Sequence, residues 1–284
     1  LPLKEVRYIG LESRLAKTES KVLDLNLAPN HINFVQHHWP DLKGQGLVAS
    51  IKEDAFDVND IDLEGRYVIS NLTSSVRDIH ATEMATIVGG EGNSFITGKG
   101  VAPDVSLSSS SFAVLEPDPI ERYNSLSISV QNHSYGTQIE NFYGSLAEDF
   151  DQSVVNMPSL LHVFSSGNDG TATPTNGIYA GISAFANLTG NFKMSKNTLS
   201  VGSVDTIGRT ISFSSRGPAY DGRIKPELVA YSMAGSSNSA ALVSGTAILL
   251  QQLYREKFGV LPDAAIIKAL LINGAKDAGP SGID

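Results

Sequence analysis

The stretch GSSNSAALVSGTAILL, residues 235–250, places small and polar residues directly before an apolar helical run. Its small side chains let another backbone approach closely, and Ser237 puts a hydroxyl just ahead of a helix predicted over 240–258. A serine nucleophile needs this access, because bulky neighbours would block its substrate. Helix capping and packing favour the same small residues, so the stretch becomes informative only together with the segments before it.

Three earlier segments supply side chains that could work with this serine. Residues 44–54, GQGLVASIKED, read as a glycine turn, a short apolar strand and an acidic end. Residues 79–90, IHATEMATIVGG, place His80 at the start of a helix, and residues 160–170, LLHVFSSGNDG, form a buried strand that leads to Asn168. Open α/β sheets carry their sites at the carboxyl ends of the strands, where these side chains lie.

The chain order of acid, histidine and serine resembles that of the subtilisin-like serine proteases, the subtilases, for which subtilisin is the reference case. Further segments carry the same resemblance: Gly100–Pro103, Asn132–Gly136, Leu199–Asp205, Phe213–Pro218 and Lys225–Ala230. The resemblance implies an α/β fold of three layers, with a mostly parallel sheet covered by helices on both faces. The alternation of strand and helix patterns along the chain favours the same architecture.

The resemblance also implies the chemistry, that of a serine endopeptidase working through an acyl-enzyme. Ser237 would be the nucleophile, and His80 would take its proton and later protonate the leaving amine. Asn168 and the backbone N–H of Ser237 would form the oxyanion hole. The substrate-binding residues that the resemblance implies are Ser134, Tyr135, Gly136, Ser165, Ser166 and Gly167.

The acid of the triad departs from the family pattern, which has Asp at the end of this strand. We expect Glu53 in its place, because strand alternation puts it on the face of Ala49 and Ile51, opposite Lys52 and Asp54. Other hydrolases use a Ser-His-Glu triad, so Glu is chemically competent. Asp54 is the alternative if the strand ends in a bulge. If both acids are merely solvated, the chain would be a catalytically inactive subtilase-fold binding domain.

Composition limits the other classes of function. The 284 residues carry a net charge of −9 and no cluster of basic residues, which disfavours nucleic acid and anionic membranes as partners. No apolar run is long enough to span a bilayer. The absence of cysteine excludes disulfides and a thiol nucleophile, and no His-x-x-x-His pair indicates a metal site.

Apolar periodicity predicts helices over 30–38, 82–89, 141–150, 240–258 and 263–273, and we expect a loop over 112–132. We expect one catalytic domain over residues 21–284, truncated at its carboxyl end relative to the family pattern. Residues 1–20 would be either the tail of a prodomain or an amino-terminal arm.

The remaining expectations rest on the resemblance alone. They are a polypeptide substrate, the chain's own prodomain as inhibitor, and secretion or attachment to the surface of a Bacteroidetes-type bacterium. No cofactor is required. A structural calcium ion could be held near Asp62 and Asn93, whose oxygens are the hard ligands that calcium prefers.

Overall fold

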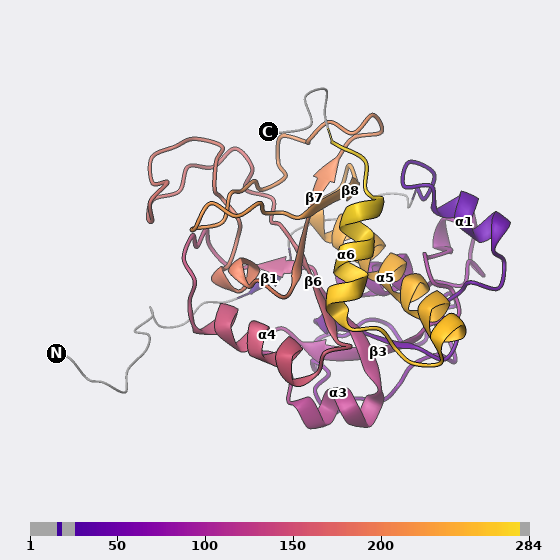
Figure 1. Ribbon diagram of the computed structural model, residues 1–284. Helices are drawn as coiled ribbons and strands as arrows, with labels where there is room; N and C mark the ends of the chain where they lie inside the picture. Colours follow the sequence, from indigo (N-terminus) through magenta and orange to yellow (C-terminus); the bar gives the residue numbers. More distant parts are fainter. Residues whose placement is uncertain (1–15, 19–25, 279–284) are drawn as a thin grey trace.

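Six parallel strands form the central sheet of the computed structural model, which describes residues 16–18 and 26–278 (Figure 1). In sheet order the strands are β3 (Ser106–Ser111), β2 (Val48–Glu53), β4 (Ile128–His133), β6 (Leu161–Ser165), β7 (Leu199–Val204) and β8 (Leu228–Tyr231). All neighbouring pairs in this sheet are parallel. Their carboxyl ends therefore meet at one edge, as the sequence predicted.

Helices cover both faces of the sheet, so the expected layered α/β fold is confirmed. One face carries α2 (Ile79–Gly89) and the long α5 (Ser236–Phe258), and the other carries α3 (Ile120–Leu126) and α4 (Ser145–Asn156). The other described helical segments are α1 (Ile32–His38), η1 (Ile96–Gly98), η2 (Asn191–Met194) and α6 (Ala264–Gly274). None of the described helices is long and apolar enough to cross a membrane.

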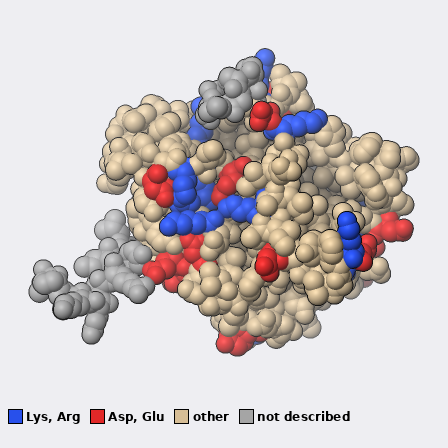
Figure 2. Space-filling model, viewed as in Figure 1, with Lys and Arg blue, Asp and Glu red and all other residues tan. Residues whose placement is uncertain are grey.

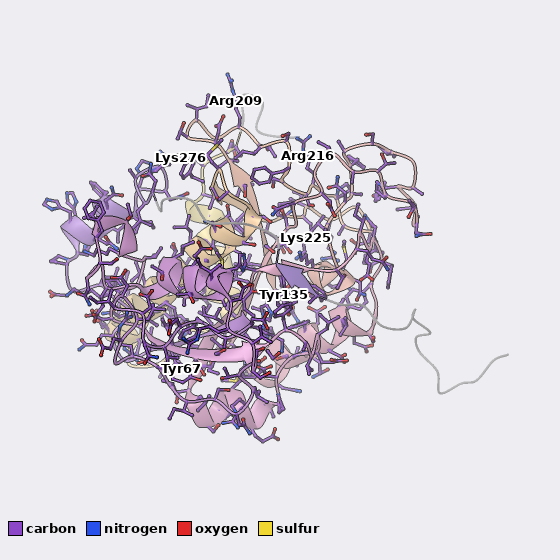
Figure 3. All side chains as sticks on the ribbon, turned by 180° about the vertical axis from the view of Figure 1, so that it is seen from behind. Tyr67, Tyr135, Arg209, Arg216, Lys225 and Lys276 are labelled. Carbon is purple, nitrogen blue, oxygen red and sulfur yellow. The ribbon has the colours of Figure 1, made fainter. Side chains whose placement is uncertain are left out.

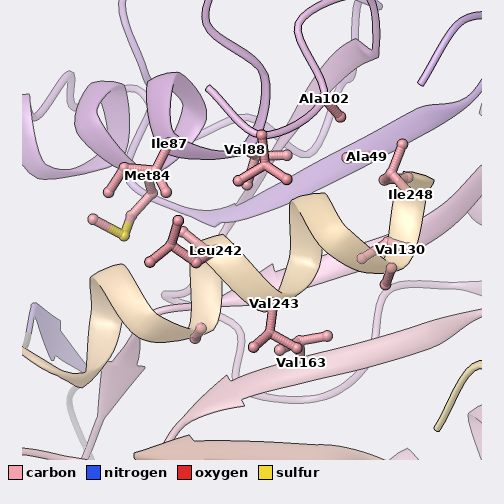
Figure 4. Close-up of a cluster of buried hydrophobic side chains, with 14 of the residues drawn as sticks. Ala49, Met84, Ile87, Val88, Ala102, Val130, Val163, Leu242, Val243 and Ile248 are labelled. Atoms are coloured by element: carbon pink, nitrogen blue, oxygen red, sulfur yellow. The ribbon is translucent and has the colours of Figure 1, made fainter. Parts of the chain in front are cut away.

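The face under α2 and α5 is the main hydrophobic core. Figure 4 shows α5 lying across the strands with α2 beside it. The buried side chains that meet there include Ala49, Val130 and Val163 from the strands, Met84 and Ile87 from α2, and Leu242, Val243 and Ile248 from α5. Removing this apolar surface from water holds the two helices against the sheet.

The opposite face is polar near β2, although it is also buried there. Lys52 is fully buried, and its Nζ lies 2.6 Å from Asp118 Oδ1. The same carboxylate accepts hydrogen bonds from Ser110 Oγ at 2.7 Å and from Gln131 Nε2 at 2.8 Å. A charge this deep needs such partners, because an unpaired buried charge is costly.

Two of the expectations about local structure are wrong. Residues 112–132 are not a loop throughout, since they contain α3 and most of β4. The prolines misled the assignment, although Pro119 occupies the cap position of α3, where proline is tolerated. The long helix begins at Ser236, so Ser237 lies in its first turn and not ahead of it.

A second, two-stranded sheet joins the start of the chain to the middle. Strand β1 (Lys17–Thr18) pairs antiparallel with β5 (Tyr135–Gly136), with Lys17 opposite Gly136 and Thr18 opposite Tyr135. Ala16 packs against the aromatic cluster around Tyr135. The rest of segment 1–20 lies outside the described residues, and so its assignment as prodomain tail or arm stays a prediction.

Charges are mixed in sign on the face that Figure 2 shows. Over the described residues as a whole, ion pairs include Arg223 Nε with Asp221 Oδ2 at 2.7 Å and Lys268 Nζ with Glu227 Oε1 at 2.9 Å. This face is therefore not uniformly negative, despite the negative net charge of the chain.

We predict that Gly245→Ala destabilises the fold. A Cβ at Gly245 would lie 2.5 Å from Val101 Cβ and 3.1 Å from Val88 O, so α5 could no longer approach these residues. Overpacking of this kind costs about 1–3 kcal/mol, more than the gain in helix propensity of about 1 kcal/mol. Denaturant unfolding measures the difference. Gly274→Ala is the matched control, because nothing lies within 4 Å of its Cβ position. Equal stability of the two variants would contradict the packing argument.

Candidate active site

A buried carboxylate and a buried imidazole meet where β2 ends. Glu53 is the last residue of β2, and His80 is the second residue of α2. His80 Nδ1 lies 3.5 Å from Glu53 Oε2, and the two side chains are 3% and 0% exposed. Asp78 caps α2 by accepting a hydrogen bond from the backbone N–H of His80 at 3.4 Å. The imidazole is thus fixed by its helix start and faces the carboxylate.

The surroundings raise the pKa of His80 above its ordinary value. Burial acts to lower the pKa, but the hydrogen bond and charge of Glu53 outweigh it, with help from the charges of Glu83 and Asp78. The protonated imidazole is therefore stabilised. This is the form that a general base must reach after taking a proton.

Asp54, the alternative acid, has a different neighbour. Its Oδ1 accepts a hydrogen bond from Ser74 Oγ at 2.7 Å. The strand does not bulge at its end, since β2 pairs with β3 in continuous register up to Glu53. The structure therefore brings Glu53, and not Asp54, to His80.

Ser237 is fully buried in the first turn of α5, next to the end of β4. Its Oγ donates a hydrogen bond to the carbonyl of Ser134 at 3.1 Å, and Ser134 Oγ donates to the carbonyl of Ser237 at 3.0 Å. The predicted substrate-binding segment and the predicted nucleophile are therefore locked together by two reciprocal hydrogen bonds.

Asn168 is anchored at the same helix start. Its Oδ1 accepts hydrogen bonds from the backbone N–H and from the Oγ of Ser236, both at 3.0 Å. Because the oxygen is engaged in this way, the Nδ2 group is the end of the amide that can donate to a ligand. Ser236 was missed from the sequence, although its position beside Ser237 was the available signal.

The segment Ser165–Gly167 begins at the last residue of β6 and contacts the first turn of α5. Gly167 has a φ of 111°, and a Cβ there would collide with Thr189 Oγ1 and Ser215 Oγ. Its backbone N–H donates to Ser236 Oγ at 3.1 Å. Only glycine fits this close approach. Thr189 lies well beyond this segment in the sequence and was missed because only the folded chain brings it here.

The residues predicted to hold calcium are engaged within the protein. The two carboxylate oxygens of Asp62 accept hydrogen bonds from the backbone N–H and the Oγ of Ser94. Asn93 Nδ2 donates to Ile61 O at 3.0 Å and to Glu91 Oε2 at 2.6 Å. Within residues 16–18 and 26–278, no group of three or more His, Cys, Asp or Glu could hold a metal. A structural calcium ion stays a prediction.

Comparison with known proteins identifies the family of this chain. A profile of the subtilase family matches residues 21–284. The chain belongs to the subtilase family. This subtilase is accordingly a serine-type endopeptidase that acts on polypeptides.

Solved structures with the same fold include maturation proteases. The prenylagaramide maturation protease PagA is 20% identical with a TM-score of 0.65, over 88% of this chain and 91% of that chain. The self-cleaved protease domain of PatA is 21% identical with a TM-score of 0.62, over 82% of this chain and 90% of that chain. These identities are low, so the likeness shows the shared fold.

We predict that Glu53→Gln lowers the pKa of His80, because the variant removes the negative charge that stabilises the imidazolium. NMR titration of the imidazole resonances measures this shift. Asp54→Asn is the matched control and should leave the His80 titration unchanged. A shift in the control as large as that in Glu53→Gln would contradict the assignment of Glu53 as the partner of His80.

Proposed function

We propose that this subtilase cleaves peptide bonds with a Ser-His-Glu triad formed by Ser237, His80 and Glu53. The observation that carries the proposal is the 3.5 Å approach of the fully buried Glu53 carboxylate to His80 Nδ1. A carboxylate in this place fixes the tautomer and orientation of the imidazole and stabilises its protonated form. Glu is one methylene longer than Asp, and β2 presents it as its final residue.

The proposed reaction is the one that a triad of this kind performs. Ser237 Oγ attacks the carbonyl carbon of the scissile peptide, and His80 Nε2 takes the hydroxyl proton. Asn168 Nδ2 and the backbone N–H of Ser237 donate to the oxyanion. When the intermediate collapses, His80 returns the proton to the leaving amine and Ser237 remains acylated. Water, deprotonated by the same imidazole, then releases the acid and regenerates the serine.

We predict that a fluorophosphonate probe phosphonylates Ser237 with loss of fluoride, and that the Ser237→Ala variant takes no label. Intact-mass analysis measures the adduct. The rate of labelling should rise with pH through the raised pKa of His80, because only the neutral imidazole acts as base. A folded chain that forms no adduct would instead support the inactive binding domain.

The substrate should add to the edge of β5. Extended peptides bind sheet edges through backbone hydrogen bonds, and β5 follows Ser134, the residue in contact with Ser237. In this structure β1 occupies that edge. We infer that residues 16–18 compete with substrate, as expected of a prodomain tail. The PatA protease domain, which has a similar fold, was solved in a self-cleaved form.

We predict that deletion of residues 1–18 lowers KM for a peptide substrate without changing kcat, because it frees the edge of β5. An occupant held by about 1.4 kcal/mol would raise KM about tenfold. Deletion of residues 1–15 is the matched control, since it keeps the pairing of β1 with β5. The idea fails if both deletions have the KM of the full chain.

Secretion or attachment to a bacterial cell surface remains an expectation of the family resemblance. Fractionation of the source cells would test it.

A further inference from the structure

We propose that His133 is a positioning residue for the substrate-binding strand, an inference that rests on the proposed function. His133 ends β4, and β5 begins after the single intervening residue Ser134. The carbonyl of Ser134 accepts the hydrogen bond from Ser237 Oγ. Ser134 thus contacts the nucleophile directly, whereas Tyr135 and Gly136, which follow it, form the edge that receives the substrate.

The imidazole of His133 joins the two strands that flank the site. Its Nδ1 lies 3.0 Å from the hydroxyl of Tyr135 in β5, and its Nε2 lies 3.0 Å from Nδ1 of His162 in β6. His162 Nε2 lies 3.3 Å from Ser153 Oγ in α4. A neutral imidazole has one donor and one acceptor nitrogen, so these hydrogen bonds run in one direction along the chain of four side chains.

The environment keeps both imidazoles neutral. His133 and His162 are fully buried, and His133 stacks on Phe164 with ring centroids 4.2 Å apart. Burial lowers the pKa of His133, as do the charges of His162, Lys52 and Lys193. Protonation of both rings would also turn two donors toward each other, which is repulsive.

The same holds for His162, whose pKa falls to about 3. Burial is the main cause and the charge of Lys52 adds to it, whereas the charge of Asp118 opposes it. The ring of Tyr123 in α3 lies 5.8 Å from that of His162. The pair is thus a permanent connection at neutral pH and not a switch.

Tyr135 transmits this connection to β5. The side chain is fully buried, with ring centroids 5.5 Å from Phe112 and 5.6 Å from Phe192. Figure 3 shows it in the interior of the molecule, well away from the outer loops that carry Arg209. The aromatic neighbours hold the ring, and His133 holds its hydroxyl. β5 has only two residues, so this side chain is a major restraint on its position.

The test uses variants that separate the two hydrogen bonds of His133. Asn places a polar atom near the position of Nδ1 and can keep the bond to Tyr135. Gln places one near Nε2 and can keep the bond to His162, and Leu keeps neither. The measurements on the full chain are kcat and KM for a peptide that extends along β5, together with the rate of Ser237 labelling by the fluorophosphonate probe.

We expect His133→Leu to raise KM about five- to tenfold, the effect of losing the hydrogen bond to Tyr135, while the labelling rate stays unchanged. His133→Asn should restore most of the wild-type KM, whereas His133→Gln should not. Tyr135→Phe, which removes only the hydroxyl, should raise KM like His133→Leu and serves if the latter does not fold.

The inference is overturned if KM is unchanged in both His133→Leu and Tyr135→Phe, or if Asn and Gln restore it equally. If the labelling rate fell in parallel with the rise in KM, His133 would have a merely structural role, and the inference would also be overturned. A wild-type chain that takes no label would refute the proposed function itself, and this inference with it.

Discussion

Two neighbouring residues of one strand bury opposite charges on opposite faces of the sheet, and much of the structure depends on how each charge is compensated. Lys52 and Glu53 are both fully buried. Placing an isolated ion in the interior is costly unless it is paired and hydrogen-bonded. Lys52 Nζ lies 2.6 Å from Asp118 Oδ1, and Glu53 Oε2 lies 3.5 Å from His80 Nδ1. The first pairing organises the polar layer under α3, and the second forms the candidate active site.

The two faces of the sheet are stabilised by different interactions. On the face of α2 and α5, apolar packing fixes the helices whose first turns carry His80 and Ser237. On the other face, hydrogen bonds of Gln131 with Asp118, Ser50 and Tyr123 link β4 to β2 and to α3. Satisfied polar networks are directional, so they define strand positions more narrowly than apolar contacts do. The candidate active site lies at the carboxyl ends of the strands, where the apolar packing of one face and the polar contacts of the other both stop.

The sequence was sufficient for the parts of this design that depend on local pattern. Alternation along residues 48–53 placed Glu53 on the face that meets α2, and the order of the motifs indicated which strand ends would meet. Local pattern could not show that the face of Lys52 is also buried, because its partner Asp118 lies 66 positions away. Most of β4 was assigned to a loop for the same reason. Gln131 and His133 are polar and would be expected at the surface, unless their partners in the folded chain are known.

The pairing at the edge of β5 could not be predicted from the sequence, and the reason is physical. A short edge strand leaves backbone groups unpaired, and any extended segment can satisfy them. Here β1 does so, through backbone pairing that carries little sequence information, which is why the sequence left residues 1–20 open between two assignments. In the proposed function a peptide substrate uses the same hydrogen-bonding groups, so substrate and β1 would exclude each other at this edge. Under the proposed function, recognition at β5 depends on how firmly the strand itself is held. The hydrogen-bonded side chains of Tyr135, His133 and His162 would supply that support from inside the molecule.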